Sequence, residues 1–71
     1  MGLILYIMDY VYVLFYGSEW EDTIIFLSKE DAINESINHP TARVEIFSKN
    51  NTVGYRPTYN FYKNGQLFQT S

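Results

Sequence analysis

Residues 59–70 read YNFYKNGQLFQT, and the Asn64-Gly65 pair inside this stretch carries the strongest local structural signal in the chain. Asn and Gly both tolerate the positive φ angles of a two-residue type I′ turn, and apolar residues alternate on either side of the pair. The stretch therefore predicts a β-hairpin. Its register pairs Lys63 with Gln66, Tyr62 with Leu67, Phe61 with Phe68, Asn60 with Gln69 and Tyr59 with Thr70.

A second hairpin is expected just before the first. Residues 42–49, ARVEIFSK, alternate between apolar and polar side chains, which is typical of a strand. Asn50 and Asn51 follow, and both residue types favour a two-residue turn. This turn would place Glu45 opposite Arg56, and their opposite charges favour that register. Pro57 then needs an edge position or a break in the ladder.

One helix is predicted in the middle of the chain. In SKEDAINESINHP, Ser28 with Asp31 three residues later forms an N-terminal capping signal, and Pro40 ends the pattern. The helix is expected over residues 29–38. Its apolar stripe is narrow, so it should cover one face of a sheet rather than fill a bundle. The stripe consists of Ala32, Ile33 and Ile37.

The opening run MGLILYIMDYVYVLFYG has too few apolar residues for a transmembrane helix, which needs about 20, and it contains Asp9. It also lacks the basic start and the small-residue cleavage site of a secretory signal. We therefore expect no membrane span and an intracellular protein. Residues 1–71 should form a single domain, in which residues 1–8 are an apolar N-terminal arm that extends the first strand or docks on another chain.

Residues 10–16 show the period-2 pattern of a strand, with Val11, Val13 and Phe15 on one side and a tyrosine stripe on the other. We expect the valine side to face the core, and the stripe to be covered by neighbours or offered to a partner. Residues 23–28, TIIFLS, should form an antiparallel second strand, because the short loop between the two runs cannot make a crossover. The stripe contains Tyr10, Tyr12, Leu14 and Tyr16.

These elements predict an α+β fold. It is a small antiparallel sheet of about five strands, in the order ββαβββ, with one short helix packed on one face. A chain of 71 residues buries only about 60% of its unfolded surface, so a partner subunit would add stability. The chain has no Cys and a single His39, so we expect no disulfide, no metal site and no cofactor.

Charge is distributed unevenly along the chain. Residues 1–42 carry seven acidic and one basic residue, a net −6, whereas residues 43–71 carry one acidic and four basic residues, a net +3. Such asymmetry can steer a partner or favour head-to-tail self-association, or it can be no more than a solvated surface. None of the common catalytic motifs is present, including G-x-S-x-G, the P-loop and H-E-x-x-H, so we predict a non-enzymatic protein.

Aromatic residues make up 18% of the chain and offer large contact areas from few side chains. The leading hypothesis is a protein–protein interaction or small structural module that forms a homo-oligomer or binds another protein. Trp20, flanked by Glu19 and Glu21, would be an anchor in an acidic loop, or would instead fold over the end of the sheet. The predicted partner-binding residues are Trp20, Tyr10, Tyr12, Tyr55, Tyr59 and Tyr62.

Single-stranded nucleic-acid binding is the alternative. The C-terminal half interleaves basic residues with Phe and Tyr, and aromatic side chains on a sheet with nearby bases are used to stack and track single strands. Four cations contact few phosphates, however, and the sequence pI of about 4.8 is far from the basic signature of such proteins. The cations concerned are Arg43, Lys49, Arg56 and Lys63.

The succession YVYVLFY, TIIFLSKEDAINESI, ARVEIFSKN and PTYNFYKNGQL, over about residues 9–68, resembles the short, Tyr- and Asn-rich uncharacterised α+β proteins of large DNA viruses that infect algae and amoebae. The resemblance implies an accessory viral protein, either a small virion component or a binder of a host factor, located in the host cytoplasm or the virion. It implies no catalytic residues.

Overall fold

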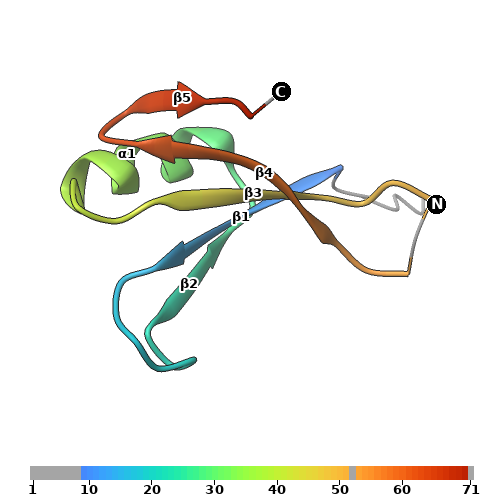
Figure 1. Cartoon of the computed structure of the whole chain (residues 1–71), viewed down its shortest axis with the longest axis horizontal. Helices are drawn as coiled ribbons and strands as arrows, with labels where there is room; N and C mark the ends of the chain where they lie inside the picture. Colours follow the sequence, from blue (N-terminus) through green and yellow to red (C-terminus); the bar gives the residue numbers. More distant parts are fainter. Residues whose placement is uncertain (1–8, 52, 71) are drawn as a thin grey trace, which may run out of the picture.

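The computed structural model describes residues 9–51 and 53–70, and the predicted arm at residues 1–8 lies outside them. The chain forms a five-stranded antiparallel sheet with one helix, in the predicted order ββαβββ (Figure 1). Among the described residues, no helix is long and apolar enough to cross a membrane. The elements are β1 (Tyr10–Phe15), β2 (Thr23–Phe26), α1 (Lys29–Asn38), β3 (Val44–Ser48), β4 (Arg56–Lys63) and β5 (Gln66–Phe68).

The sheet order is β2-β1-β3-β4-β5, so the two N-terminal strands lie beside the C-terminal three, and β1 pairs with both β2 and β3. Both edge strands are short, with four residues in β2 and three in β5. The sheet is visibly twisted, since β1 and β2 run obliquely to β3 and β4 (Figure 1). α1 therefore faces only part of one side of the sheet.

The helix begins and ends where the sequence predicts. The Ser28 hydroxyl accepts a hydrogen bond from the Asp31 backbone N–H at 3.3 Å, which caps the first turn. At the other end the His39 backbone N–H donates to the Glu35 carbonyl. The buried residues of α1 are Ala32 and Ser36, four positions apart, whereas Ile37 is half exposed, so the predicted apolar stripe was only partly right.

Ser36 joins the helix to the C-terminal hairpin. Its hydroxyl donates to the Ile33 carbonyl at 2.7 Å and accepts from the Gly65 backbone N–H at 2.9 Å, and the residue is fully buried. The Asn64-Gly65 turn itself has the two positive φ angles of a type I′ turn, 51° and 80°. Its register matches the prediction over Lys63↔Gln66, Tyr62↔Leu67 and Phe61↔Phe68. Beyond Phe68, Thr70 is held through side-chain hydrogen bonds to Asn60 and Tyr59.

The predicted sides of β1 are reversed. Tyr12 and Leu14 pack beneath α1 in the core, while Phe15 on the opposite side is 48% exposed. Val13 is buried, but on the side away from the helix, because its cross-strand partners are Ile25 and Glu45. Both sides of this strand are apolar, so alternation alone does not decide which side the helix covers.

The predicted β3–β4 register is also wrong. Arg56 lies opposite Ser48 rather than Glu45, so seven residues of sequence rather than two separate the paired strands. The ladder then shifts: Glu45 pairs with Phe61 and Phe47 with Pro57, so β4 carries two more residues than β3 across this interval. β5 pairs only with residues 61–63, so Pro57 does occupy a local edge, as expected.

The bulge replaces lost backbone pairing with side-chain hydrogen bonds. The Thr58 hydroxyl donates to the Ile46 carbonyl at 2.8 Å and accepts from the Asn60 backbone N–H at 3.1 Å. Between them, Tyr59 adopts a φ of +69°, a conformation that bulky residues rarely adopt. The strain is thus held in place by the hydrogen bonds on either side.

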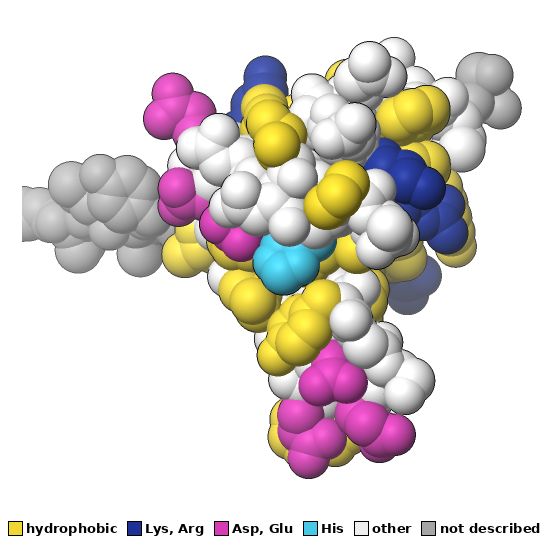
Figure 2. Space-filling model, turned by 90° about the vertical axis from the view of Figure 1, so that its left-hand side faces the viewer, with side chains coloured by type: hydrophobic (Ala, Val, Ile, Leu, Met, Phe, Trp, Pro, Cys, Tyr) yellow, Lys and Arg dark blue, Asp and Glu magenta, His cyan; other side chains and the backbone are white. Residues whose placement is uncertain are grey.

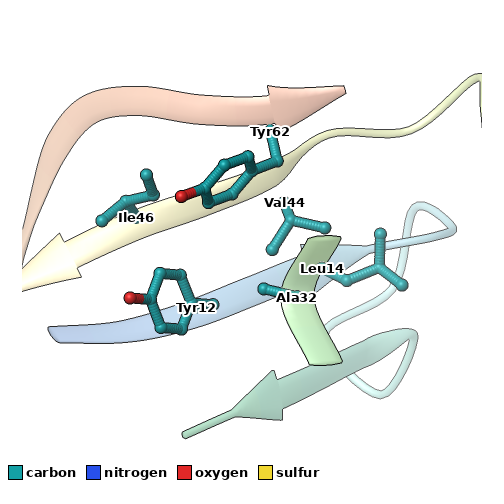
Figure 3. Packing of buried hydrophobic residues seen from close by; sticks show 6 residues of the cluster. All are labelled: Tyr12, Leu14, Ala32, Val44, Ile46 and Tyr62. Atoms are coloured by element: carbon teal, nitrogen blue, oxygen red, sulfur yellow. The ribbon is translucent and has the colours of Figure 1, made fainter. Parts of the chain in front are cut away.

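The core lies between α1 and the three central strands (Figure 3). Leu14, Val44 and Ala32 are fully buried. Because Ala32 and Ser36 are small, the helix can approach the sheet closely at this point. The cluster consists of Tyr12, Leu14, Ala32, Val44, Ile46 and Tyr62, with Phe26, Ile33 and Ala42 packed against it.

Candidate interaction surfaces

The side of the sheet opposite α1 carries a row of mainly apolar side chains that we call the open face. Cross-strand pairing aligns one residue from each strand, because directly paired residues point to the same side. Exposure rises toward both edges, from 7% at Val13 to 62% at Ile25 and 43% at Phe68. The row is Ile25, Val13, Glu45, Phe61 and Phe68, and Val11, Phe47 and Pro57 form a second row beside it.

Glu45 is the only acid in these two rows, and it has a cationic neighbour. The Arg43 Nε atom lies 3.6 Å from the Glu45 carboxylate, and the guanidinium lies over the Phe61 ring, 4.5 Å from its centroid. Phe68 stacks with Phe61 in a nearly parallel orientation at 5.1 Å between centroids. The Phe61 ring therefore contacts both an arginine from the β3 side and a phenylalanine from β5.

A groove of about 780 Å³ lies on the helix side of the sheet, next to Lys29 at the start of α1. We call it the tyrosine groove. The ten-residue helix leaves this part of the sheet uncovered, and two cations and one acid lie along it, a local net charge of +1. It is lined by Asp9, Tyr10, Tyr12, Lys29, Ile46, Ser48, Lys49, Asn50, Thr58, Asn60, Tyr62, Leu67 and Gln69.

Tyr12 and Tyr62 form the inner wall of the groove. Their side chains are 8% and 6% exposed, and their ring centroids are 6.3 Å apart. Both hydroxyls point toward Ile46 and away from Ala32 and Leu14 (Figure 3). No described residue hydrogen-bonds to either hydroxyl, and no buried side-chain polar atom of the described residues lacks a partner, so the hydroxyls open into the groove.

The pKa of Tyr12 is raised above its ordinary value of 10.0, first because burial disfavours the phenolate, and then because Tyr62 and Tyr10 would repel it. At neutral pH its hydroxyl is therefore firmly protonated. It can donate a hydrogen bond to a carboxylate or carbonyl oxygen that enters the groove.

The loop between β1 and β2, residues 16–22, carries Trp20 at its tip, and we call it the acidic loop. Trp20 is 82% exposed, so it does not fold over the end of the sheet. The loop is shaped by a hydrogen bond from the Asp22 backbone N–H to the Glu19 carbonyl. A Cβ at Gly17 would collide with the Asp22 side chain, so a larger residue here would displace that side chain from its present position. One cluster of acidic side chains lies at the bottom of the view in Figure 2, the end where Figure 1 draws this loop, and other acidic side chains lie at the upper left.

The six predicted partner-binding residues do not form one surface. Trp20 stands alone at the loop tip, and Tyr12 and Tyr62 are core residues that expose little more than a hydroxyl. Tyr10 is half exposed at the rim of the groove. The other two lie elsewhere along the chain: Tyr59 is 67% exposed in the bulge, and Tyr55 is partly buried with Lys49 5.9 Å from its ring.

The four cations proposed for nucleic acid are divided between the two sides of the sheet. Arg43 and Lys63 belong to the open side, with Phe61. Lys49 lines the tyrosine groove on the helix side, and the register places Arg56 on that same side, opposite Ser48. No single strand can therefore contact all four from one side of the sheet.

Residues of the open face were missing from the sequence-based site. Ile25, Glu45 and Phe68 belong to it. The alternation within their strands was the available signal, but the sequence did not indicate which side of the sheet α1 covers. Among residues 9–51 and 53–70, no three His, Asp or Glu side chains come together as a metal site would require. Comparison with protein-family models, with curated proteins and with solved structures finds no match to this chain.

Proposed function

We propose that this chain is a non-enzymatic interaction module that buries the open face against a second copy of itself. The observation that carries the proposal is an apolar row across all five strands on the side that α1 does not cover. Sheets that are apolar on both sides are typically covered on both sides. A second sheet packed face to face would supply the missing layer.

The charges on the open face suit a second copy. In a two-fold symmetric interface the same patch meets itself, so it has to be self-complementary. Arg43 and Glu45 form a pair of net charge zero beside the apolar row. When two copies face each other, the Arg43 of each can approach the Glu45 of the other without leaving a net charge in the contact.

The size of the face sets the expected strength. Five strands span about 24 Å at about 4.8 Å per strand, and the two rows are only about 7 Å apart, so the footprint is at the small end of specific interfaces. We therefore expect a reversible dimer whose population rises with protein concentration. The roles implied by the viral resemblance, a virion component or a host-factor binder, are both forms of such a module.

Two side chains of types that are common in catalysis make structural contacts, which supports a non-enzymatic role. The Asp22 carboxylate accepts from the Glu19 backbone N–H, and His39 lies 3.5 Å from Glu35 at the helix end. The alternative is single-stranded nucleic-acid binding on the open face, favoured by Arg43 lying over Phe61 beside Phe68. It is the weaker candidate because the four cations are divided between the two sides of the sheet and the sequence pI is about 4.8.

The test is the solution mass by light scattering or sedimentation across concentration, with variants on one strand. Ile25 and Ile24 are adjacent in β2 and point to opposite sides of the sheet. In a two-fold symmetric dimer, Ile25→Glu introduces one negative charge from each copy into the contact, so we expect the dissociation constant of the dimer to rise at least tenfold. Ile24→Glu should leave the dimer intact. A monomer at every concentration, or equal association of both variants, would overturn the proposal.

A charge-swap experiment tests whether the partner is a second copy in this arrangement. Arg43→Glu and Glu45→Arg each place like charges opposite one another, so each variant alone should dimerise less than the wild type. Mixing the two should restore association, because an all-acidic patch then meets an all-basic one. Binding of single-stranded oligonucleotide that weakens with salt, without any dimer, would instead favour the alternative.

A further inference from the structure

The acidic loop and the tyrosine groove are complementary in chemistry. The loop presents an exposed indole with three flanking carboxylates, from Glu19, Glu21 and Asp22. The groove presents two ammonium groups, from Lys29 and Lys49, with tyrosine hydroxyls and amides between them. We propose that the acidic loop of one copy docks in the tyrosine groove of a second copy, with Trp20 inserted among its tyrosines.

The inner wall of the groove supplies the first argument. The Tyr12 and Tyr62 side chains are more than nine-tenths buried, and their hydroxyls open into the groove without a partner among the described residues. Neither hydroxyl is a buried unsatisfied group, so each is accessible from the groove to an incoming acceptor, and hydrogen bonds to charged acceptors are the stronger ones. The carboxylates of the loop are such acceptors, and the protonated Tyr12 hydroxyl is a donor.

Trp20 supplies the second argument. Tryptophan is enriched among the residues that dominate binding energy, and it contributes most when binding buries it in a pocket away from water. At 82% exposure the indole makes almost no use of its apolar area within its own chain. The groove offers apolar surface from Ile46 and Leu67 next to the aromatic rings, and its volume of about 780 Å³ is ample for an indole.

Charge supplies the third argument. The groove has a local charge of +1, since Asp9 partly offsets Lys29 and Lys49, while the loop carries −3. Lys49 lines the groove, and its ammonium group lies 5.9 Å from the centroid of the Tyr55 ring. Complementary charge of this kind accelerates association and weakens with salt.

The loop cannot reach the groove of its own chain. Asp9 and Tyr10, at the start of β1, line the groove, whereas the loop follows Phe15 at the other end of that strand. Six residues of strand separate the two sites by about 20 Å. The contact is therefore between copies and joins unlike surfaces, so it links copies head to tail, in a closed ring or an open filament.

This inference rests on the proposed self-association, but the docking uses none of the open-face residues, so the two can fail separately. Trp20 is the only tryptophan of the chain, which makes its fluorescence a direct probe of the loop. Burial of the indole shifts its emission to the blue and protects it from acrylamide. In a dimer made through the open face alone, the loop tip stays exposed and the emission does not change.

The experiment separates donor from acceptor. The donor is the Lys29→Glu/Lys49→Glu variant, which keeps its loop but has a reversed groove. The acceptor is Trp20→Ala, which keeps its groove and is silent in fluorescence. We expect titration of acceptor into donor to shift the donor emission to the blue, with binding at least tenfold weaker in high salt than in low salt. All three positions are exposed, so both variants should fold.

Two controls make the result decisive. An acceptor that also carries Lys29→Glu/Lys49→Glu should produce no shift, whereas an acceptor that carries Lys63→Glu, a single charge reversal outside the groove, should behave like Trp20→Ala alone. Adding Ile25→Glu to both proteins removes the open-face contact and should leave the shift intact. Unchanged donor emission at every concentration, or an equal shift with the reversed groove, would overturn the docking even if the dimer persists.

Discussion

The two sides of the sheet differ in what covers them. On the helix side, Leu14 and Val44 are fully buried beneath α1, whereas on the open side Ile25 is 62% and Phe68 43% exposed. Ten helical residues are only about 15 Å long, against a sheet about 24 Å wide. One short helix therefore stabilises the fold on part of one side. Among the described residues, the tyrosine groove and the open face are the surfaces of the sheet that α1 leaves uncovered.

The largest expected effect comes from truncating the helix side. Leu14→Ala removes a fully buried side chain, and we expect the free energy of unfolding to fall by about 3 kcal/mol, measured by urea denaturation at low protein concentration. Ile25→Ala makes a similar truncation on the open side and should cost less than about 1 kcal/mol. Equal losses would mean that the open side is already covered within one chain.

A smaller loss is expected at the link between α1 and the hairpin. Ser36→Ala removes the acceptor of the Gly65 backbone N–H without changing the fit of the helix, so the unfolding free energy should fall by about 1–2 kcal/mol. The Gly65 amide should also exchange faster with solvent. Ser18→Ala, at an exposed position of the acidic loop, is the matched control and should change neither quantity.

The elements that the sequence predicts well are those specified by neighbouring residues. The Asn64-Gly65 turn supplies its own positive φ angles, and the Ser28 cap supplies its own acceptor, so both appear where expected. The β3–β4 register failed because it depends on a longer connection and on a bulge. That bulge is held by Thr58 bonding to Ile46, twelve residues away, which no local pattern reveals.

The candidate site was harder to predict because tyrosine is ambiguous. Tyr12 and Tyr62 look like surface contact residues in a polar stripe, yet both bury their rings in the core and expose their hydroxyls. Which side of β1 faces the helix is decided by residues far along the chain, notably Val44 opposite Leu14. The sequence also left open whether Trp20 would be exposed or would fold over the end of the sheet, and its 82% exposure decides for the first alternative.

Alkaline pH should reveal the burial of Tyr12. Its folded-state pKa is raised above 10.0 by burial and by Tyr62 and Tyr10, so the folded state binds more protons than the unfolded state above pH 10. The stabilisation is fully present below pH 10 and is lost as the pH rises through the folded-state pKa. Tyr12→Phe should be close to wild type at pH 7 and should decline less steeply above pH 10, as followed by urea denaturation across pH. Parallel declines would mean that Tyr12 is solvated.

The smallest expected effect lies in the bulge of β4. Tyr59 has a φ of +69° and a side chain that is 67% exposed. Its backbone is therefore strained, and little buried side-chain surface compensates for that strain. Tyr59→Gly should therefore leave the unfolding free energy unchanged or raise it by up to about 1 kcal/mol, because glycine adopts positive φ without strain. The same change at Tyr62, which is buried, should be strongly destabilising and serves as the contrast. A loss of more than about 1 kcal/mol for Tyr59→Gly would mean that the ring packs against something outside the single chain, which would make the bulge part of an interface.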